Sequence, residues 1–215
     1  MNTSPQELHR GTLSDAIDML VAAEGTGAQA YILSGKLVSG PNALRNLADA
    51  VHYLCLLHGR FPGVVDHAAT KTADNVARKW LIDAANAFAT ERSFVTKLSV
   101  LAGPLPSTLG QQQCETAVIA QRHALDMLAQ SDRKGCALGA AVALTLDWRT
   151  IRAILDISSE RLDLKPPICA LPDVPSTVDM LAHVAGDAAM ERAVNFGAQQ
   201  LLGQHRGLWD LLAAR

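Results

Sequence analysis

Apolar residues recur every three or four positions along almost the whole chain, which is the spacing of one face of an α-helix. No stretch shows the strict alternation of apolar and polar residues that is typical of a half-buried strand. Glycines and prolines divide the pattern into six predicted helices, at about 13–24, 41–58, 64–102, 111–130, 134–162 and 176–202, with an ambiguous piece at 28–38. We therefore predict an all-α fold.

The predicted helices form one set, because no polar linker is long enough to separate two groups of them. The segment 163–175 holds four prolines and is predicted to be a long crossover loop. Long helices joined by short turns and one crossover are typical of a four-helix bundle with added helices. The prediction is a single helical-bundle domain of about six helices over residues 1–215.

Composition and charge narrow the classes of partner. Charged residues make up 19% of the chain and aromatic residues 4%, against about 25% charged residues in an average soluble domain. Nineteen Lys and Arg face 21 Asp and Glu, so there is no basic excess to neutralise phosphates. We expect no nucleic-acid partner and no binding to an anionic membrane.

Location and redox state follow from the apolar runs and the cysteines. The longest apolar run, Cys136 to Leu146, is too short to span a bilayer, and the first residues lack a signal-peptide pattern. The sequence thus predicts a cytoplasmic protein. Its four cysteines contain no Cys-x-x-Cys pair, so we interpret them as buried free thiols.

Four ionisable residues fall on the apolar faces of predicted helices when each residue advances 100° around the axis. Glu91 lies at the centre of the stripe of the third helix, and Glu191 lies at the centre of the stripe of the sixth. Asp147 stands among the apolar residues of the fifth helix, and His58 ends the stripe of the second. All four are predicted to be buried.

An ionised carboxylate in a protein core costs several kcal/mol unless it is paired, metal-bound or protonated. One hypothesis is a polar site in which Glu91, Glu191, His58 and Asp147 bind iron or manganese, with oxygen-dependent redox chemistry. The alternative is a non-catalytic scaffold or partner-binding module, in which each carboxylate is paired with an arginine, a tryptophan N–H or a helix terminus. The sequence leaves both open, and with them the question of enzymatic activity.

Two resemblances bear on the metal hypothesis. The pairs Glu91-Arg92 and Glu191-Arg192 on long core helices resemble ferritin-like carboxylate bundles, although Phe94 and Val194 stand where that family has histidines. His183 and Asp187 resemble part of the His-x-x-x-Asp-x-x-His motif of haem-oxygenase-like di-iron oxygenases. Both resemblances imply a helical bundle with iron or manganese ligands in its core.

A third resemblance covers about a fifth of the chain, through three segments: HGRFPGVVDHAA (58–69), AGPLPSTLGQ (102–111) and QRHALDMLAQSDRKGCALGAA (121–141). On these segments the chain resembles an uncharacterised all-helical bacterial family. That resemblance implies the fold class and adds no chemistry.

Two further features point to partners. Arg60 precedes the predicted start of the third helix, where it could bind an anion, but Asp66 is equally well placed to cap that start. Ile119 and Met127 lie on the outward side of the fourth helix. We interpret them as covered by a further helix or as the surface of a homodimer. No small-molecule ligand is indicated.

Overall fold

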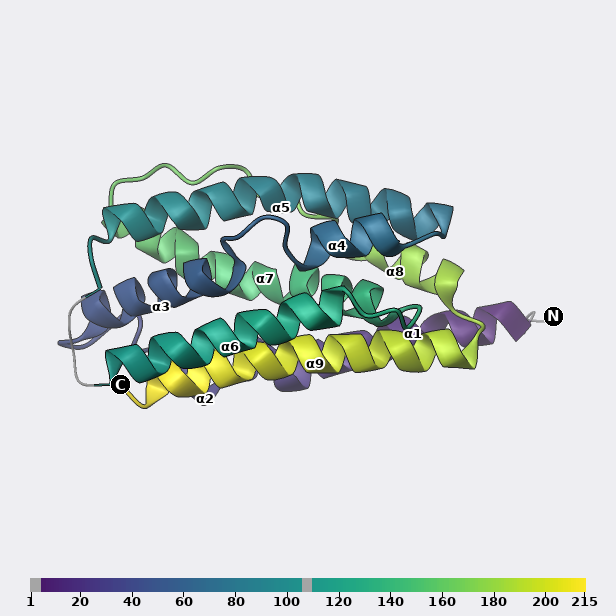
Figure 1. The fold of residues 1–215 in the computed structure, drawn as a ribbon, viewed down its shortest axis with the longest axis horizontal. Coiled ribbons are helices and arrows are strands. Elements are labelled where there is room, and N and C mark those ends of the chain that lie inside the picture. The colour runs from purple at the N-terminus through teal and green to yellow at the C-terminus, as the bar shows by residue number, and fades with distance from the viewer. Residues whose placement is uncertain (1–4, 106–109) are drawn as a thin grey trace.

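The computed structural model describes residues 5–105 and 110–215, with side chains from Leu13 onward. Within these ranges the regular structure is entirely helical, as the sequence predicts (Figure 1). The helices are α1 (Pro5–Glu24), η1 (Thr26–Ala28), α2 (Ala30–Leu33), α3 (Ala43–His58), α4 (Val64–Lys71), α5 (Asn75–Leu101), α6 (Gln111–Ala129), α7 (Cys136–Arg161), α8 (Val174–Val184) and α9 (Ala188–Ala213). The all-α class is confirmed, while a ferritin-like architecture stays a prediction.

The prediction of about six helices was too low because two of the predicted helices are each broken into two, and because the short helices η1 and α2 form in and beside the ambiguous piece at 28–38. The third breaks after Lys71, where Asp74 caps α5 by accepting a hydrogen bond from the Ala77 N–H at 2.8 Å. The sixth breaks at Gly186, whose φ of +120° no helical residue adopts. Asp187 then caps α9 through the Ala189 N–H at 2.9 Å.

The most extensive helix contact in the molecule joins α7 and α9, which run in the same direction (Figure 1). Glycines allow their backbones to approach closely. A Cβ on Gly139 of α7 would lie 1.9 Å from the Val194 carbonyl oxygen, and one on Gly197 of α9 would lie 2.0 Å from the Cys136 carbonyl oxygen. Because the helices are parallel, residues that follow these glycines at equal intervals remain neighbours.

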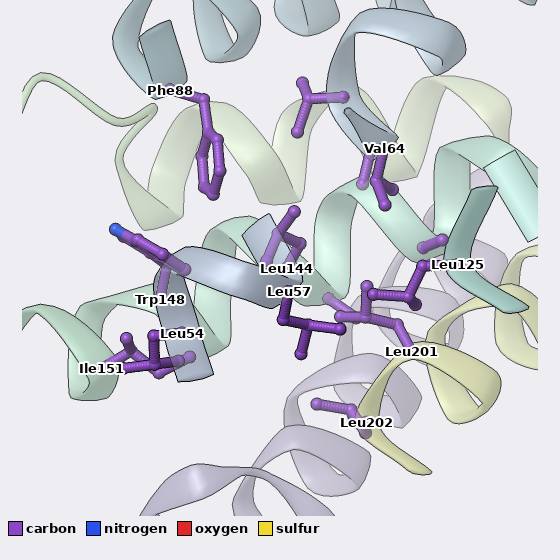
Figure 2. Packing of buried hydrophobic residues seen from close by; sticks show 14 of the residues in the cluster. Leu54, Leu57, Val64, Phe88, Leu125, Leu144, Trp148, Ile151, Leu201 and Leu202 are labelled. Atoms are coloured by element: carbon purple, nitrogen blue, oxygen red, sulfur yellow. The ribbon is translucent and has the colours of Figure 1, made fainter. Parts of the chain in front are cut away.

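The buried apolar side chains form one continuous cluster that extends across the bundle. Figure 2 shows its centre, where Trp148 and Leu144 of α7 face Phe88 of α5 and Leu57 of α3. Each fully buried side chain of this size contributes about 1.5–3 kcal/mol relative to an exposed one. The polar residues described below are set into this cluster.

Two predictions about the surface have different outcomes. Ile119 and Met127 are exposed, at 42% and 63%, and their role in a homodimer stays a prediction. The cysteines are free thiols, but only Cys114 and Cys136 are buried. Cys55 is partly exposed, and Cys169 is exposed because it lies in the proline-rich crossover. Across the described ranges, none of the helices combines the length and apolarity needed to traverse a bilayer.

Candidate functional site

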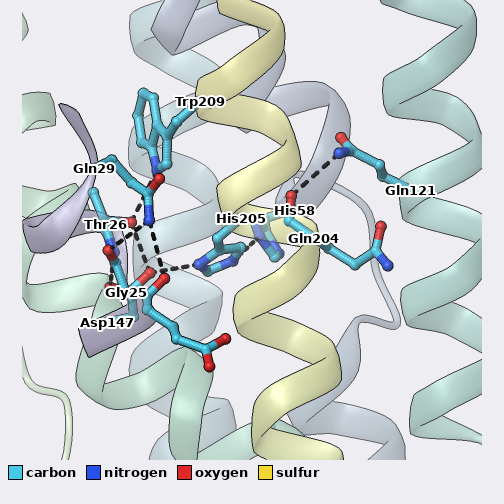
Figure 3. Close-up of polar contacts among 10 residues, drawn as sticks. Gly25, Thr26, Gln29, His58, Gln121, Asp147, Gln204, His205 and Trp209 are labelled. Atoms are coloured by element: carbon cyan, nitrogen blue, oxygen red, sulfur yellow. Dashed lines mark hydrogen bonds and ion pairs between the residues drawn. The ribbon is translucent and has the colours of Figure 1, made fainter. Parts of the chain in front are cut away.

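Asp147, on α7, accepts hydrogen bonds from the short turn that follows α1. Its Oδ1 atom accepts from the Thr26 backbone N–H at 2.7 Å, and its Oδ2 atom accepts from the Thr26 hydroxyl at 2.7 Å (Figure 3). A Cβ on Gly25 would lie 2.7 Å from Asp147 Oδ1, so a side chain there would collide with the carboxylate. The turn thus holds the carboxylate in one position.

His205, on α9, joins Asp147 to His58 at the end of α3. Its Nδ1 atom lies 2.6 Å from Asp147 Oδ2, and its Nε2 atom lies 2.8 Å from His58 Nε2. Asp147 and His205 are eight residues beyond Gly139 and Gly197, a rise of about 12 Å along each helix. The close parallel packing of α7 and α9 therefore aligns the carboxylate with the imidazole.

Burial and hydrogen bonding move the pKa values of this cluster in a consistent way. Burial would raise the pKa of Asp147, but hydrogen bonds from His205 and Thr26 outweigh it and hold the pKa below its usual value. Burial lowers the pKa of His58 well below its ordinary range, and a positive charge on His205, when that ring is protonated, or on Arg92 lowers it further. Asp147 is therefore ionised and His58 neutral at neutral pH.

These charge states assign the ring protons. An ionised carboxylate can only accept, so His205 donates to Asp147 from Nδ1. With both rings neutral, Nε2 of His205 is an acceptor, and His58 donates to it from its own Nε2. In this arrangement the remaining nitrogen of His58, Nδ1, carries a lone pair, and it forms no hydrogen bond with any described residue.

His58 lines a small pocket of about 20 Å³ under the connection between α3 and α4, which is room for about one water molecule. Only 6% of His58 is exposed. Three arginines also line this pocket, which we call the His58 pocket: Arg60, Arg92 and Arg122. Two aromatic rings also pack edge-on against the imidazole, with centroids 5.5 Å away for Trp148 and 6.5 Å away for Phe88.

Glu91 forms a separate cluster and is fully buried, as predicted. Its Oε1 atom accepts from Arg152 Nη1 at 2.6 Å, and its Oε2 atom accepts from the indole N–H of Trp148 at 3.0 Å. Arg152 also donates to Asp156 and lies over the ring of Phe94, 4.6 Å from its centroid. For Glu91, the arrangement matches the paired-carboxylate alternative.

Glu191 is only half-buried, so its predicted position at the centre of an apolar stripe was wrong. The break at Gly186 is the reason, since it places Glu191 in the first turn of α9 and changes the phase of the face. Its Oε1 atom accepts from the Gly186 N–H at 3.0 Å, which ties the link between α8 and α9 to the helix start.

The structure thus brings together two of the four predicted site residues, His58 and Asp147, through His205. Glu91 and Glu191 lie in two other clusters. Over the described ranges, no three histidines, cysteines or acids gather closely enough to bind a metal ion. Of the haem-oxygenase-like pair, His183 contacts Asp74 at 3.2 Å and Asp187 caps α9.

His205 is the site residue that the sequence analysis missed. A signal was present, since His205 follows Leu201 and Leu202 by four and three residues and precedes Leu208 by three. All four are fully buried. The predicted stripe of the sixth helix ended at Leu202, one turn before the histidine.

No curated protein and no solved structure matches this chain. One protein family matches it over residues 21–215, which include every residue of the two buried clusters. The chain belongs to that family, which is described as a family of unknown function (DUF6975).

Proposed function

We propose that this protein carries a buried acid–base site in which His58 takes a proton from a water molecule or ligand in the His58 pocket. The observation that carries the proposal is the 2.8 Å contact between two buried imidazoles, continued to an ionised carboxylate. A neutral histidine oriented by a second group is the usual form of a general base.

The chain of three groups offsets part of the cost that burial imposes on protonating His58. When Nδ1 accepts a proton, the proton on Nε2 of His58 can pass to Nε2 of His205. The positive charge then resides on His205, which donates to the Asp147 carboxylate at 2.6 Å. An imidazolium beside a carboxylate is far more stable in a core than an isolated one. The relay therefore moves charge inward without leaving it unpaired.

The same donors argue for proton chemistry over an iron or manganese site. Each nitrogen of His205 and the two oxygens of Asp147 are engaged within the chain of hydrogen bonds. A metal ion would need lone pairs that these contacts already use. The nitrogen left for a ligand is His58 Nδ1.

Nitrogen-15 NMR of the histidine side chains tests the proposal. Near neutral pH we expect His58 and His205 each in one neutral tautomer, with the proton on Nε2 of His58 and on Nδ1 of His205. In Asp147→Asn the tautomer preference of His205 should weaken, while exposed His123 serves as the internal control. Tautomer averaging of both buried rings in the wild type would contradict the proposal.

A second function, a non-catalytic partner-binding module, is favoured by the exposure of Met127 and Ile119. Under this alternative we expect sedimentation to show a dimer that Met127→Glu dissociates. A monomer at all concentrations would exclude the homodimer. A binding module would then need a partner other than a second copy of this chain.

A further inference from the structure

The rim of the His58 pocket carries more positive than negative charge. Arg92 is neutralised by a two-pronged ion pair with Asp66, at 2.7 and 3.2 Å. Asp66 also accepts from the Gly63 N–H, so it serves as the predicted cap of α4. That leaves Arg60 and Arg122 against Asp126, and none of these three has an ion-pair partner among the described residues.

Arg60 and Arg122 are available to a ligand. Arg60 is exposed, and its guanidinium has no hydrogen bond with a described residue. Arg122 makes one long contact, 3.5 Å from Nη1 to the Leu56 carbonyl oxygen. Guanidinium groups bind carboxylate and phosphate oxygens in paired hydrogen bonds. The mouth of the pocket thus favours an oxyanion.

The inner end of the pocket imposes a second requirement. His58 is only 6% exposed. Its Nδ1 lone pair is the acceptor left on the ring. A fully deprotonated anion would place oxygen lone pairs against that nitrogen. An oxyanion that still carries a hydroxyl group can donate it to Nδ1, and the 20 Å³ of space admits one such oxygen.

We propose that the His58 pocket binds a small oxyanion bearing a proton, with its hydroxyl donating to His58 Nδ1 and its other oxygens bound by Arg60 and Arg122. This inference rests on the proposed function, because it uses the same lone pair. Hydrogen phosphate has the required chemistry, whereas sulfate of equal charge carries no proton near neutral pH.

Binding should also be linked to the protonation of His58. The groups that face this ring are His205 of α9, Arg92 of α5, Arg60 of the connection, and Arg122 with Asp126 of α6; Asp147 acts through His205. The cations disfavour a charged imidazole, and a bound anion offsets them. The phosphate hydroxyl, however, needs the lone pair of a neutral ring, so phosphate should raise the pH at which His58 titrates less than sulfate does.

Calorimetry of the full chain with inorganic phosphate and with sulfate, near neutral pH, tests the proposal. We expect phosphate to bind about tenfold or more tightly than sulfate, the size of one hydrogen bond to a charged group. In His58→Phe the two ions should bind equally. Arg60→Gln and Arg122→Gln should each weaken both ions about tenfold, and Arg78→Gln, at an exposed arginine of α5, should change neither.

Equal affinity for phosphate and sulfate in the wild type would overturn the proposal, as would binding that Arg60→Gln leaves unchanged. Arg60 is exposed, so that variant tests the site without disturbing the core. The absence of binding by either ion would overturn it as well. The proposed acid–base site is tested separately by the NMR tautomers, because these are measured without any ligand. A failure of anion binding can therefore be distinguished from a failure of the acid–base site.

Discussion

Asp147 and Glu91 are both carboxylates with 1% exposure or less, yet their partners give them different chemistry. Glu91 is held by Arg152, whose pKa its acidic neighbours raise even above the ordinary value despite burial. Arginine does not release its proton in proteins. Asp147 is held by an imidazole, which is a side chain that can gain and lose a proton. Partner type, and not burial, separates this fixed ion pair from the proposed proton relay.

The two clusters are close neighbours because consecutive residues of α7 serve them. Asp147 points to the turn after α1 and to His205, while Trp148 donates its indole N–H to Glu91. The ring of the same Trp148 packs against His58. The Glu91 cluster therefore holds the Trp148 ring that packs against His58.

Arg152→Met should give the largest effect, because it leaves Glu91 buried without its countercharge. We expect a loss of about 3–5 kcal/mol in the free energy of unfolding, measured by urea denaturation. Adding Glu91→Gln removes the charge and keeps an oxygen for the Trp148 N–H, so the double variant should regain at least part of the loss. A single variant within about 1 kcal/mol of wild type would show that the ion pair is not essential.

Asp147→Asn should cost less, about 1–3 kcal/mol. The amide retains the shape of the carboxylate, but its NH₂ group cannot accept from Thr26 or His205, so one buried donor is left without a partner. Urea denaturation gives the cost. A loss as large as that of Arg152→Met would show that the type of partner does not set the cost of disturbing a buried carboxylate.

The pH dependence of the free energy of unfolding tests the histidine of the Asp147 cluster directly. The pKa of His58 is well below that of an unfolded histidine, which is about 6.5. Between these values the unfolded chain binds a proton that the folded chain does not, so stability falls as pH decreases below about 6.5, by up to about 1.4 kcal/mol per pH unit.

His58→Phe should reduce that slope, as urea midpoints between about pH 6.5 and 5 would show. The depressed pKa of Asp147 acts in the same direction, but only near and below about pH 4. A slope unchanged in His58→Phe would assign the titration to other groups.

His183→Gln should have the smallest effect. His183 and Asp74 lie 3.2 Å apart, like the buried pair in chemistry, but both side chains are more than a third exposed. Exposed pairs contribute about 0–1 kcal/mol, so we expect a change in the urea midpoint near the limit of detection. If His183→Gln lost as much stability as Asp147→Asn, burial would not explain why the two histidine–aspartate pairs differ in their contribution.

The sequence predicted well what depends on local spacing. Helix positions, the burial of Glu91, Asp147 and His58, and the cap at Asp66 all follow from periodicity or from residues within one turn. It predicted poorly what depends on a break in a helix. Gly186 ends one helix and Asp187 starts another, which moved Glu191 from the expected core face to the first turn of α9.

By itself, then, the sequence determined which residues lie inside the bundle wherever a helix is unbroken, because the free energy of burial acts on each helix face separately. The tertiary structure decided which of them meet. Asp147 and His205 are 58 positions apart, and only the close parallel packing of α7 on α9 at Gly139 and Gly197 brings them together. Pairing at such separations depends on the relative direction and spacing of whole helices, which no single helix encodes.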